Sequence, residues 1–389
     1  MAAYLLIEIV ATMLAWVCWW DSSMWLFEDS GRTWHFDAVR GYRLTQTPSR
    51  FARITNGNTE FLGTARGNVQ GFPDRHDFSR KRQVPGVPRV AVFGDSFTEA
   101  QYLRLNWPAR VEDLAREQGA PVRMLNFGVS GGGLANWWST LTKIVAAEEY
   151  EIDGVIFAVY PGDLRRRFSM WEHRDVKHPL FGRVPSWDPR TYPITLTEAR
   201  RYLKEHPAYI LTPAEFERTI KGHWPRQVPR RLRPFFLTQA WRFVYNLARP
   251  HADLVDEVPA GSSPDHVRLV SDIRQFLAEH HLPALVVEIP DRASLLNPSR
   301  APAWPGQEAR AFADAIGARL LDVTPEFAAL SPGQIRAQFL PYDGHWSQAG
   351  SDRFAAFVVQ HLDAFRAGAK AAEASQERVP QAAGKTDSS

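Results

Sequence analysis

Ser96 stands at the end of a short apolar run, at a position where a serine can act as a nucleophile. The run Val90–Phe93 has the length and composition of a buried parallel strand, and Gly94 allows a tight turn after it. A helix start at Ser96 would place its hydroxyl at the carboxyl edge of the sheet, near backbone N–H groups and the positive end of a helix dipole. Such a site favours a reaction that develops an oxyanion. A serine after a strand is common, so catalysis also requires a base, an acid and further oxyanion donors.

Asp343 and His345 are the candidate acid and base. They lie two residues apart, in a loop with Pro and Gly just before the last predicted helix. A turn can fold the carboxylate back to the imidazole, which would fix the tautomer and stabilise the imidazolium, as in a Ser-His-Asp triad. Taken alone, a histidine in such a loop is more often a surface residue or a hydrogen-bonding group at a helix start. The pair His280–His281 lies on a predicted helix away from any strand end and is interpreted as structural.

Two further loops follow predicted strands. Residues 126–133 read Asn-Phe-Gly-Val-Ser-Gly-Gly-Gly, and a glycine-rich turn lets backbone N–H groups approach a ligand closely, as an oxyanion hole requires. The loop lacks the spacing of a nucleotide-binding loop. Pro161–Leu164 follow the third strand and point to the same edge. The convergence of these loops with Ser96 and the Asp343–His345 loop predicts an active site at this edge of the sheet.

Alternating strand and helix patterns must position these residues. Strands are predicted at 89–93, 122–127, 154–160, 283–289 and 319–323, and helices at 107–118, 134–149, 265–281, 306–316 and 347–366. Such alternation predicts βαβ units and a parallel sheet with helices on both faces.

A long stretch between the third and fourth strands exceeds what one crossover needs. We interpret residues 165–260 as a mostly helical insertion over the sheet edge, with helices at Thr197–His206, Pro213–Lys221 and Leu237–Leu247. Basic residues far outnumber acidic ones in its first 86 positions, 165–250. These charges either solvate its outer face or form a rim that attracts an anionic polymer or lipid headgroup.

Composition narrows the class of protein. Apolar content of 44% and charged content of 23% are ordinary for a globular chain, and the net charge of +3 gives no nucleic-acid signature. The single cysteine, Cys18, excludes an intramolecular disulfide and a cysteine-based zinc site. Fourteen tryptophans are many, and they suit a membrane interface, sugar-stacking surfaces or simply a buried core.

The two ends of the chain differ from its middle. Residues 4–20 form an apolar stretch about as long as the shortest membrane-spanning helix, although Glu8 interrupts it and no basic residue precedes it. We predict a membrane anchor or signal segment at 1–28, with a buried or interfacial helix as the alternative. A polar lead-in at 29–88 would pack on a catalytic domain at 89–366, and the tail at 367–389 is predicted to be disordered.

The motifs together resemble those of the SGNH (GDSL-type) hydrolases. Gly94–Phe97 resembles the family's first block with its nucleophile, Gly128 matches the second-block glycine, and Asp343-x-His345 matches the last block. The segment Asn68–Asp74 resembles the lead-in of many membrane-linked members. The resemblance covers residues 35–163 and 265–365. It implies a flavodoxin-like three-layer α/β/α fold with a central parallel sheet.

The chain departs from the family pattern at two places. Gly162 stands where the third block supplies an asparagine to the oxyanion hole, and losing such a donor costs on the order of 100-fold in rate. Either Asp163 or Asn136 substitutes, the backbone N–H groups suffice, or the enzyme is weakened. The acid also lies two residues before the histidine instead of three. This Asp-x-His-Trp form is similar to that of the polysaccharide O-acetyltransferase branch, including alginate acetylation proteins.

The resemblance implies an acyl-enzyme mechanism. His345 would take the proton of Ser96, Asp343 would hold the imidazole, and the N–H groups of Ser96 and Gly128 would meet the oxyanion. No metal or cofactor is expected. The leading hypothesis is a serine esterase acting on small or polysaccharide O-acyl esters at the bacterial cell envelope, linked to the membrane through its N-terminal segment. The alternatives are an acetyltransferase of the same fold and a non-catalytic carbohydrate-binding protein. The oligomeric state stays open.

Overall fold

The computed structural model centres on a five-stranded parallel sheet. It describes residues 23–28, 34–37, 39–55, 58–166, 171–172, 184–185, 208–211, 213–218, 220, 264–301 and 303–366. The strands of the central sheet are β6 (Arg89–Phe93), β7 (Arg123–Asn126), β8 (Gly154–Val159), β12 (Ala284–Glu288) and β13 (Arg319–Asp322). Their order is β13-β12-β8-β6-β7, and every neighbouring pair is parallel. This order is the flavodoxin-like one, so the predicted fold class is confirmed.

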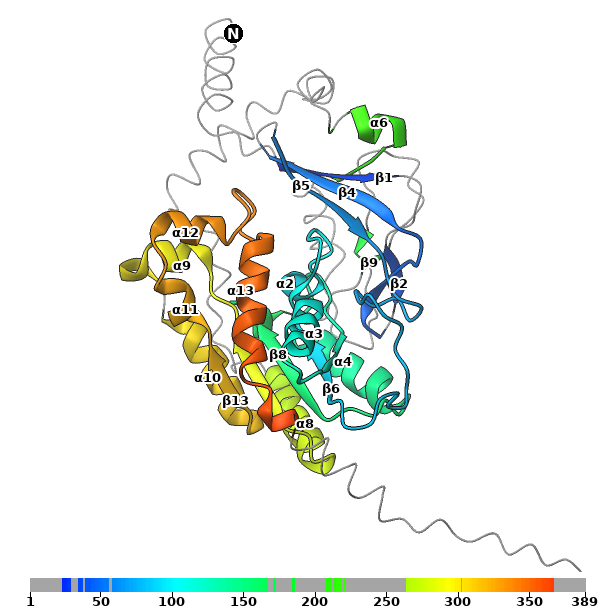
Figure 1. Ribbon diagram of the computed structural model, residues 1–389, viewed down its shortest axis with the longest axis vertical. Coiled ribbons are helices and arrows are strands. Elements are labelled where there is room, and N and C mark those ends of the chain that lie inside the picture. The colour runs from blue at the N-terminus through cyan, green and yellow to red at the C-terminus, as the bar shows by residue number, and fades with distance from the viewer. Residues whose placement is uncertain are drawn as a thin grey trace, which may run out of the picture.

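Helices cover both faces of the central sheet (Figure 1). One face packs against α4 (Leu134–Thr140), α8 (Pro264–Glu279) and α10 (Trp304–Ile316), and the other against α3 (Trp107–Glu117), α11 (Thr324–Ala328), α12 (Pro332–Ala337) and α13 (Gln348–Val359). Successive residues of β6 divide between the two faces: Ala91 and Phe93 join the first cluster, and Val90 and Val92 join the second. All residues of β6 and β8 are buried, as a parallel sheet between two helical layers requires.

The connecting segments contain shorter helices. These are α2 (Ser96–Glu99), a π-helix that continues α4 over Leu141–Ala146, 3₁₀ turns at Asp163–Arg165 and Pro298–Arg300, and α9 (Arg292–Leu296).

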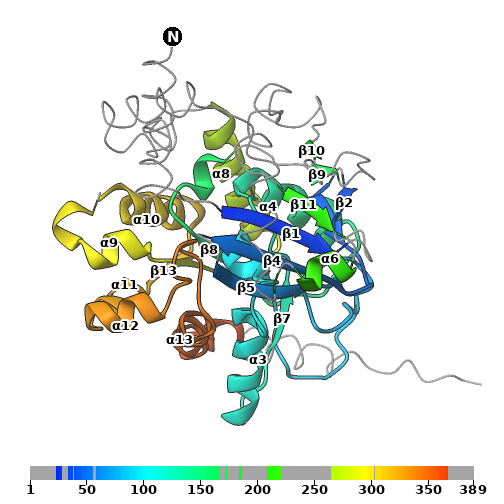
Figure 2. The same cartoon turned by 90° about the horizontal axis from the view of Figure 1, so that it is seen from above.

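A second sheet lies across the end of the central one, above α2 in Figure 1 and over β8 when seen from above in Figure 2. It contains β1 (Ser23–Glu28), β4 (Ser49–Thr55), β5 (Asn58–Ala65) and β11 (Ala208–Leu211), in the order β11-β1-β4-β5. The pairs β1–β4 and β4–β5 are antiparallel, and β11 runs parallel to β1. Two smaller pairs join β2 (Trp34–Asp37) with β3 (Gly41–Leu44), and β9 (Trp171–Glu172) with β10 (Val184–Pro185).

The end of the expected N-terminal anchor is corrected by this sheet. Residues Ser23–Glu28 form strand β1 and not part of an apolar helix. Leu26 packs on one face with Phe216, and Phe27 packs on the other face with Phe51. This alternation of buried side chains, together with pairing to β4, favours a strand. Residues 4–20 lie outside the described residues, and so does the predicted tail at 367–389. No helix within the described ranges is long and apolar enough to cross a membrane.

The insertion is described in part. Its described residues include β9, β10, β11 and α6 (Pro213–Arg218), and the short strands were not predicted. The helix α6 falls within the predicted helix 213–221, whereas the predicted helices at 197–206 and 237–247 lie outside the described residues.

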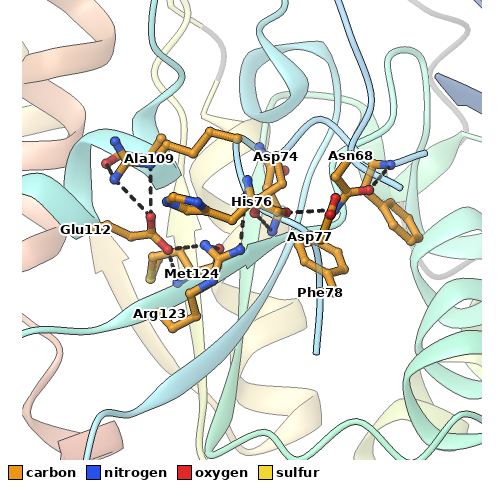
Figure 3. A network of polar contacts seen from close by, with 12 residues as sticks. Asn68, Asp74, His76, Asp77, Phe78, Ala109, Glu112, Arg123 and Met124 are labelled. Atoms are coloured by element: carbon orange, nitrogen blue, oxygen red, sulfur yellow. Dashed lines mark hydrogen bonds and ion pairs between the residues drawn. The ribbon is translucent and has the colours of Figure 1, made fainter. Parts of the chain in front are cut away.

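The lead-in segment is tied to the core by buried polar contacts (Figure 3). Asp74 accepts a hydrogen bond of 3.0 Å from the guanidinium of Arg123 and one of 3.2 Å from the backbone N–H of Asn126. Burial raises the pKa of Asp74, although the charge of Arg123 opposes that rise. Glu112 of α3 also pairs with Arg123. These contacts fix the end of β7, from which the glycine-rich loop begins.

Candidate active site

The fold brings Ser96, from near the start of the domain in sequence, together with Asp343 and His345, from near its end. The Oγ of Ser96 lies 2.6 Å from Nε2 of His345. On the other side of the ring, Nδ1 of His345 contacts Oδ1 of Asp343. An ionised carboxylate can only accept, so Nδ1 carries the proton and Nε2 is left to accept from the serine hydroxyl. The side chain of Asp343 is 1% exposed and that of His345 is 27% exposed, so solvent reaches the ring but not its acid.

The end of β6 fixes the position of Ser96. Asp95 caps the start of α2, because its Oδ1 accepts the backbone N–H of Phe97 at 2.9 Å. Gly94 is required for space, since a Cβ there would collide with the side chain of Thr98. A helix does begin at Ser96, as predicted, but it is a single turn that ends at Glu99 and is followed by Ala100 with φ of 42°. A single turn carries little of the helix dipole, so the expected dipole contribution is small.

The loop before α13 holds the imidazole by packing and by a tight turn. Phe97 stacks on the ring of His345 with centroids 4.7 Å apart, and Tyr102 meets it edge-on at 5.4 Å. Gly344 has φ of +85°, which lets the chain turn back between the acid and the base. Trp346 is fully buried against aromatic side chains of the core, so it anchors the loop and offers no surface for sugar stacking.

Two charged residues of the second sheet support Asp343, and the sequence did not reveal them. Arg53 of β4 forms an ion pair with Oδ2 of Asp343. Glu60 of β5 accepts the backbone N–H of Asp343 at 2.6 Å and that of Tyr342 at 2.7 Å. Its side chain is fully buried. On a strand, an arginine and a glutamate have the pattern of ordinary surface charges, so only the tertiary structure identifies their role.

The predicted oxyanion donors are arranged differently from the expectation. The backbone N–H of Gly128 donates to Oδ1 of Asn126 at 2.9 Å, within its own loop. Gly162 has φ of +91°, and a Cβ added there would meet no atom of the described residues within 4 Å. The position of the expected asparagine is therefore not filled by any described side chain.

Neither suggested substitute for that asparagine presents a donor to Ser96, which corrects two of the predicted site residues. Asn136 is fully buried, and its amide donates to the carbonyl of Arg40 at 3.1 Å. Asp163 is also fully buried; it accepts the backbone N–H of Tyr160 at 3.0 Å and lies 2.7 Å from Arg166. Burial raises the pKa of Asp163, and the charge of Arg166 opposes this effect. Both side chains therefore point into the protein.

Arg166 places a cation beside the nucleophile. Its Nη1 lies 3.0 Å from Oδ2 of Asp95, and that oxygen lies 3.4 Å from Oγ of Ser96. The same nitrogen donates to the carbonyl of Gly132 at 3.2 Å. Burial lowers the pKa of Arg166, but its two carboxylate partners more than offset this and raise it. From the sequence, Arg166 is one of the many basic residues of the stretch 165–250. Nothing in the run Arg165–Arg167 distinguishes it from its two neighbours.

A cavity lies near the site but does not include the triad. A cavity of about 340 Å³ opens between the lead-in and the start of α3, and its lining includes Arg66, Arg104 and Asn106 but neither Ser96 nor His345. Within the described ranges, no group of three or more His, Cys, Asp or Glu side chains could hold a metal ion.

Comparisons with known proteins give only distant likenesses. No protein-family model matches the chain, and no curated protein matches it. Among solved structures it is similar to a lipase/acylhydrolase from Enterococcus faecalis, at 13% identity and a TM-score of 0.35, over 71% of this chain and 95% of that one. It is also similar to a mutant of an acetyl-xylooligosaccharide esterase from Geobacillus, at 13% identity and a TM-score of 0.36, over 72% and 96% of the two chains. A two-domain esterase active on acetylated mannans shares 11% identity with a TM-score of 0.36, over 72% of this chain and 50% of that one.

Proposed function

We propose that the protein is a serine esterase that hydrolyses O-acyl esters, with acetyl esters of carbohydrates as its substrate class. The observation that supports this most strongly is the 2.6 Å separation between Oγ of Ser96 and Nε2 of His345, with Asp343 on the opposite ring nitrogen. A nucleophile, its base and the group that orients the base thus lie in one hydrogen-bonded chain.

The proposed reaction runs through an acyl-enzyme. Oγ of Ser96 attacks the ester carbonyl while Nε2 of His345 takes its proton, and a tetrahedral oxyanion forms. When the bond to the leaving alcohol breaks, the imidazolium returns its proton to that alcohol oxygen. Water then attacks the acyl-serine with His345 again as the base, which releases the carboxylic acid and restores the hydroxyl. Asp343 stays ionised and stabilises the imidazolium in both halves of the reaction.

The substrate class rests on two features. The ring of His345 is partly exposed, so the alcohol half of a bulky ester can reach it from solvent. The Asp-x-His-Trp form of the loop resembles that of the polysaccharide O-acetyltransferase branch. The same resemblance keeps an acetyltransferase as the second candidate, because a sugar hydroxyl in place of water would complete the same acyl-enzyme cycle. As part of this proposal, the apolar stretch at residues 4–20 supports a location at the cell envelope.

Labelling with a fluorophosphonate probe tests the nucleophile. We expect the probe to modify Ser96 in the folded protein and to leave the S96A variant unlabelled. Failure of the wild-type protein to react would remove both enzymatic candidates and favour a non-catalytic carbohydrate-binding protein.

Hydrolysis of p-nitrophenyl acetate, with and without an added oligosaccharide, separates the two enzymatic candidates. We expect free acetate in both cases. Acetylated sugar in place of acetate would contradict hydrolysis and support the transferase.

A further inference from the structure

We propose that Arg166 is a catalytic residue that supplies the oxyanion donor absent at Gly162. This inference rests on the proposed ester chemistry at Ser96, because an oxyanion arises only if the serine attacks a carbonyl. Arg166 follows Gly162 by four residues, on the same strand-end loop from which the family's asparagine would come.

Part of the guanidinium of Arg166 is not engaged by any residue that the structure describes. All of its contacts with described residues, to Asp95, Asp163 and Gly132, are made through Nη1. Among those residues Nε and Nη2 have no acceptor, and the side chain is 32% exposed. A guanidinium carries its donors in a rigid plane, so fixing Nη1 also fixes the direction of the remaining N–H groups. Arg166 therefore combines an anchored half with a half that is free to bind.

The glycine-rich loop leaves room for the side chain of Arg166 and accepts a hydrogen bond from it. A Cβ at Gly133 would lie 2.8 Å from Cβ of Arg166, so only glycine leaves room for the arginine there. The glycine-rich loop was predicted to turn its own N–H groups toward an oxyanion. Instead, the carbonyl of Gly132 accepts from Arg166, and the N–H of Gly128 is directed to Asn126. Because no described atom fills the space beside Gly162, the anchored guanidinium can present its remaining N–H groups to a carbonyl oxygen bound at Ser96.

The carboxylates of Asp95 and Asp163 determine how strongly Arg166 can stabilise an oxyanion. They hold the guanidinium in place before the reaction, which is what electrostatic stabilisation of a transition state requires. They also share its charge, so the stabilisation of an oxyanion is weaker than that from an unpaired cation. Removing one donor of an oxyanion hole costs about 100- to 1,000-fold. We therefore expect the loss here to lie between about 10- and 100-fold.

The competing explanation is that Arg166 only neutralises the buried carboxylates of Asp95 and Asp163. The variant Arg166→Lys separates the two, because an ammonium keeps the charge beside both carboxylates but lacks the second, fixed set of N–H groups. We expect kcat to fall about 10- to 100-fold with KM nearly unchanged. The inhibition constant of a boronic acid, which forms a tetrahedral adduct with serine, should rise by the same factor.

Three further variants support the comparison. Arg165→Lys is the matched control, since Arg165 lies on the same turn but pairs with Glu308 at 2.8 Å. It should leave both constants unchanged. In Arg166→Ala, millimolar guanidinium should restore part of kcat. Should Arg166→Lys not fold, the pair Asp163→Asn/Arg166→Gln removes one charge of each sign and should show the same parallel loss.

The outcomes are distinct from those that test the esterase itself. A folded Arg166 variant with wild-type kcat and wild-type boronic acid affinity would overturn the role of Arg166 while leaving the esterase intact. A lower thermal midpoint alone, with both constants unchanged per active site titrated by fluorophosphonate, would also overturn it and leave Arg166 as a counter-ion. If the wild-type protein is neither labelled at Ser96 nor active on p-nitrophenyl acetate, the proposed function fails first.

Discussion

The two sides of Ser96 are built in opposite ways. On the side of the base, His345 contacts Asp343, Asp343 pairs with Arg53, and Glu60 binds the backbone of the same loop. On the oxyanion side, Gly162 has no side chain, and no described atom would contact a Cβ placed there. Three charged side chains, those of Asp343, Arg53 and Glu60, therefore hold the base and its loop, whereas oxyanion stabilisation would depend on few groups.

The difference shows how each half depends on the fold. The base and acid come from one short loop, and a second sheet secures that loop through two charged strand residues. The oxyanion side is assembled from separate strand-end loops, so a change in one loop can be compensated by a side chain from another. We infer that a substitution on the base side cannot be compensated, because its residues are held in one rigid loop. A donor lost on the oxyanion side can be replaced by a side chain from another loop.

Removal of the base should have the largest effect. We expect His345→Ala to lower kcat for p-nitrophenyl acetate by about 10⁴- to 10⁶-fold, because the other described acceptor near Oγ of Ser96, the carboxylate of Asp95 at 3.4 Å, is already paired with Arg166. Fluorophosphonate labelling of Ser96 should slow in parallel. His280→Ala, at an exposed position in the turn after α8, is the control and should change neither rate. Retained activity in His345→Ala would show that the base side has been assigned wrongly.

Removal of Arg53 should have a smaller effect with a distinctive pH signature. In Arg53→Gln, Asp343 loses its ion pair, and we expect kcat to fall about tenfold as the loop loosens. Loss of this cation also favours the imidazolium over the neutral ring. The acidic limb of kcat/KM should therefore move to higher pH, by about half a unit to one unit.

A matched control for Arg53 lies on the same strand. Arg50 pairs with Glu28 and Glu217 instead of the acid, so Arg50→Gln should leave the pH profile in place. A profile of Arg53→Gln that overlays the wild-type profile would contradict a direct role for the second sheet.

A side chain added at Gly162 tests the oxyanion side directly. Asn tolerates a positive φ better than most residues, and the space beside Gly162 is open, so Gly162→Asn should fold. In the wild-type background we expect kcat to rise only a few-fold, because Arg166 already occupies the role. In Arg166→Lys the same change should recover about tenfold, and this non-additivity is the expected result. Equal effects in both backgrounds would show that the two positions act independently.

The part of the site that depends on spacing along the chain could be predicted from the sequence. The spacing of Ser96 after an apolar strand and of Asp343 before His345 was sufficient to place these residues at one sheet edge, and the alternation of strands and helices was sufficient for the flavodoxin-like order. It could not assign Arg53 or Arg166. The contact of Arg53 with Asp343 and that of Arg166 with Asp95 join segments distant in sequence, and charged residues on strands and turns have no periodic signature.

Glu288 is a carboxylate at the same sheet edge that forms no ion pair with an arginine of the described residues, although the charge of Arg310 opposes the rise of its pKa. It ends β12 opposite Asp322 of β13, and burial, with the nearby charge of Asp322, raises its pKa to about 7. The folded protein thus binds a proton that the unfolded chain releases above pH 4.5, so stability falls as pH rises from about 4.5 to 7. We expect Glu288→Gln to raise the free energy of unfolding at pH 8 by about 1 to 2 kcal/mol, after allowance for solvent screening, and to change it little at pH 4.5. Denaturant unfolding at both pH values measures this, with Glu279→Gln on the exposed surface of α8 as the control. Because Glu288 touches neither half of the site, kcat should stay at the wild-type value. A loss of activity would instead show that the oxyanion side extends across β12.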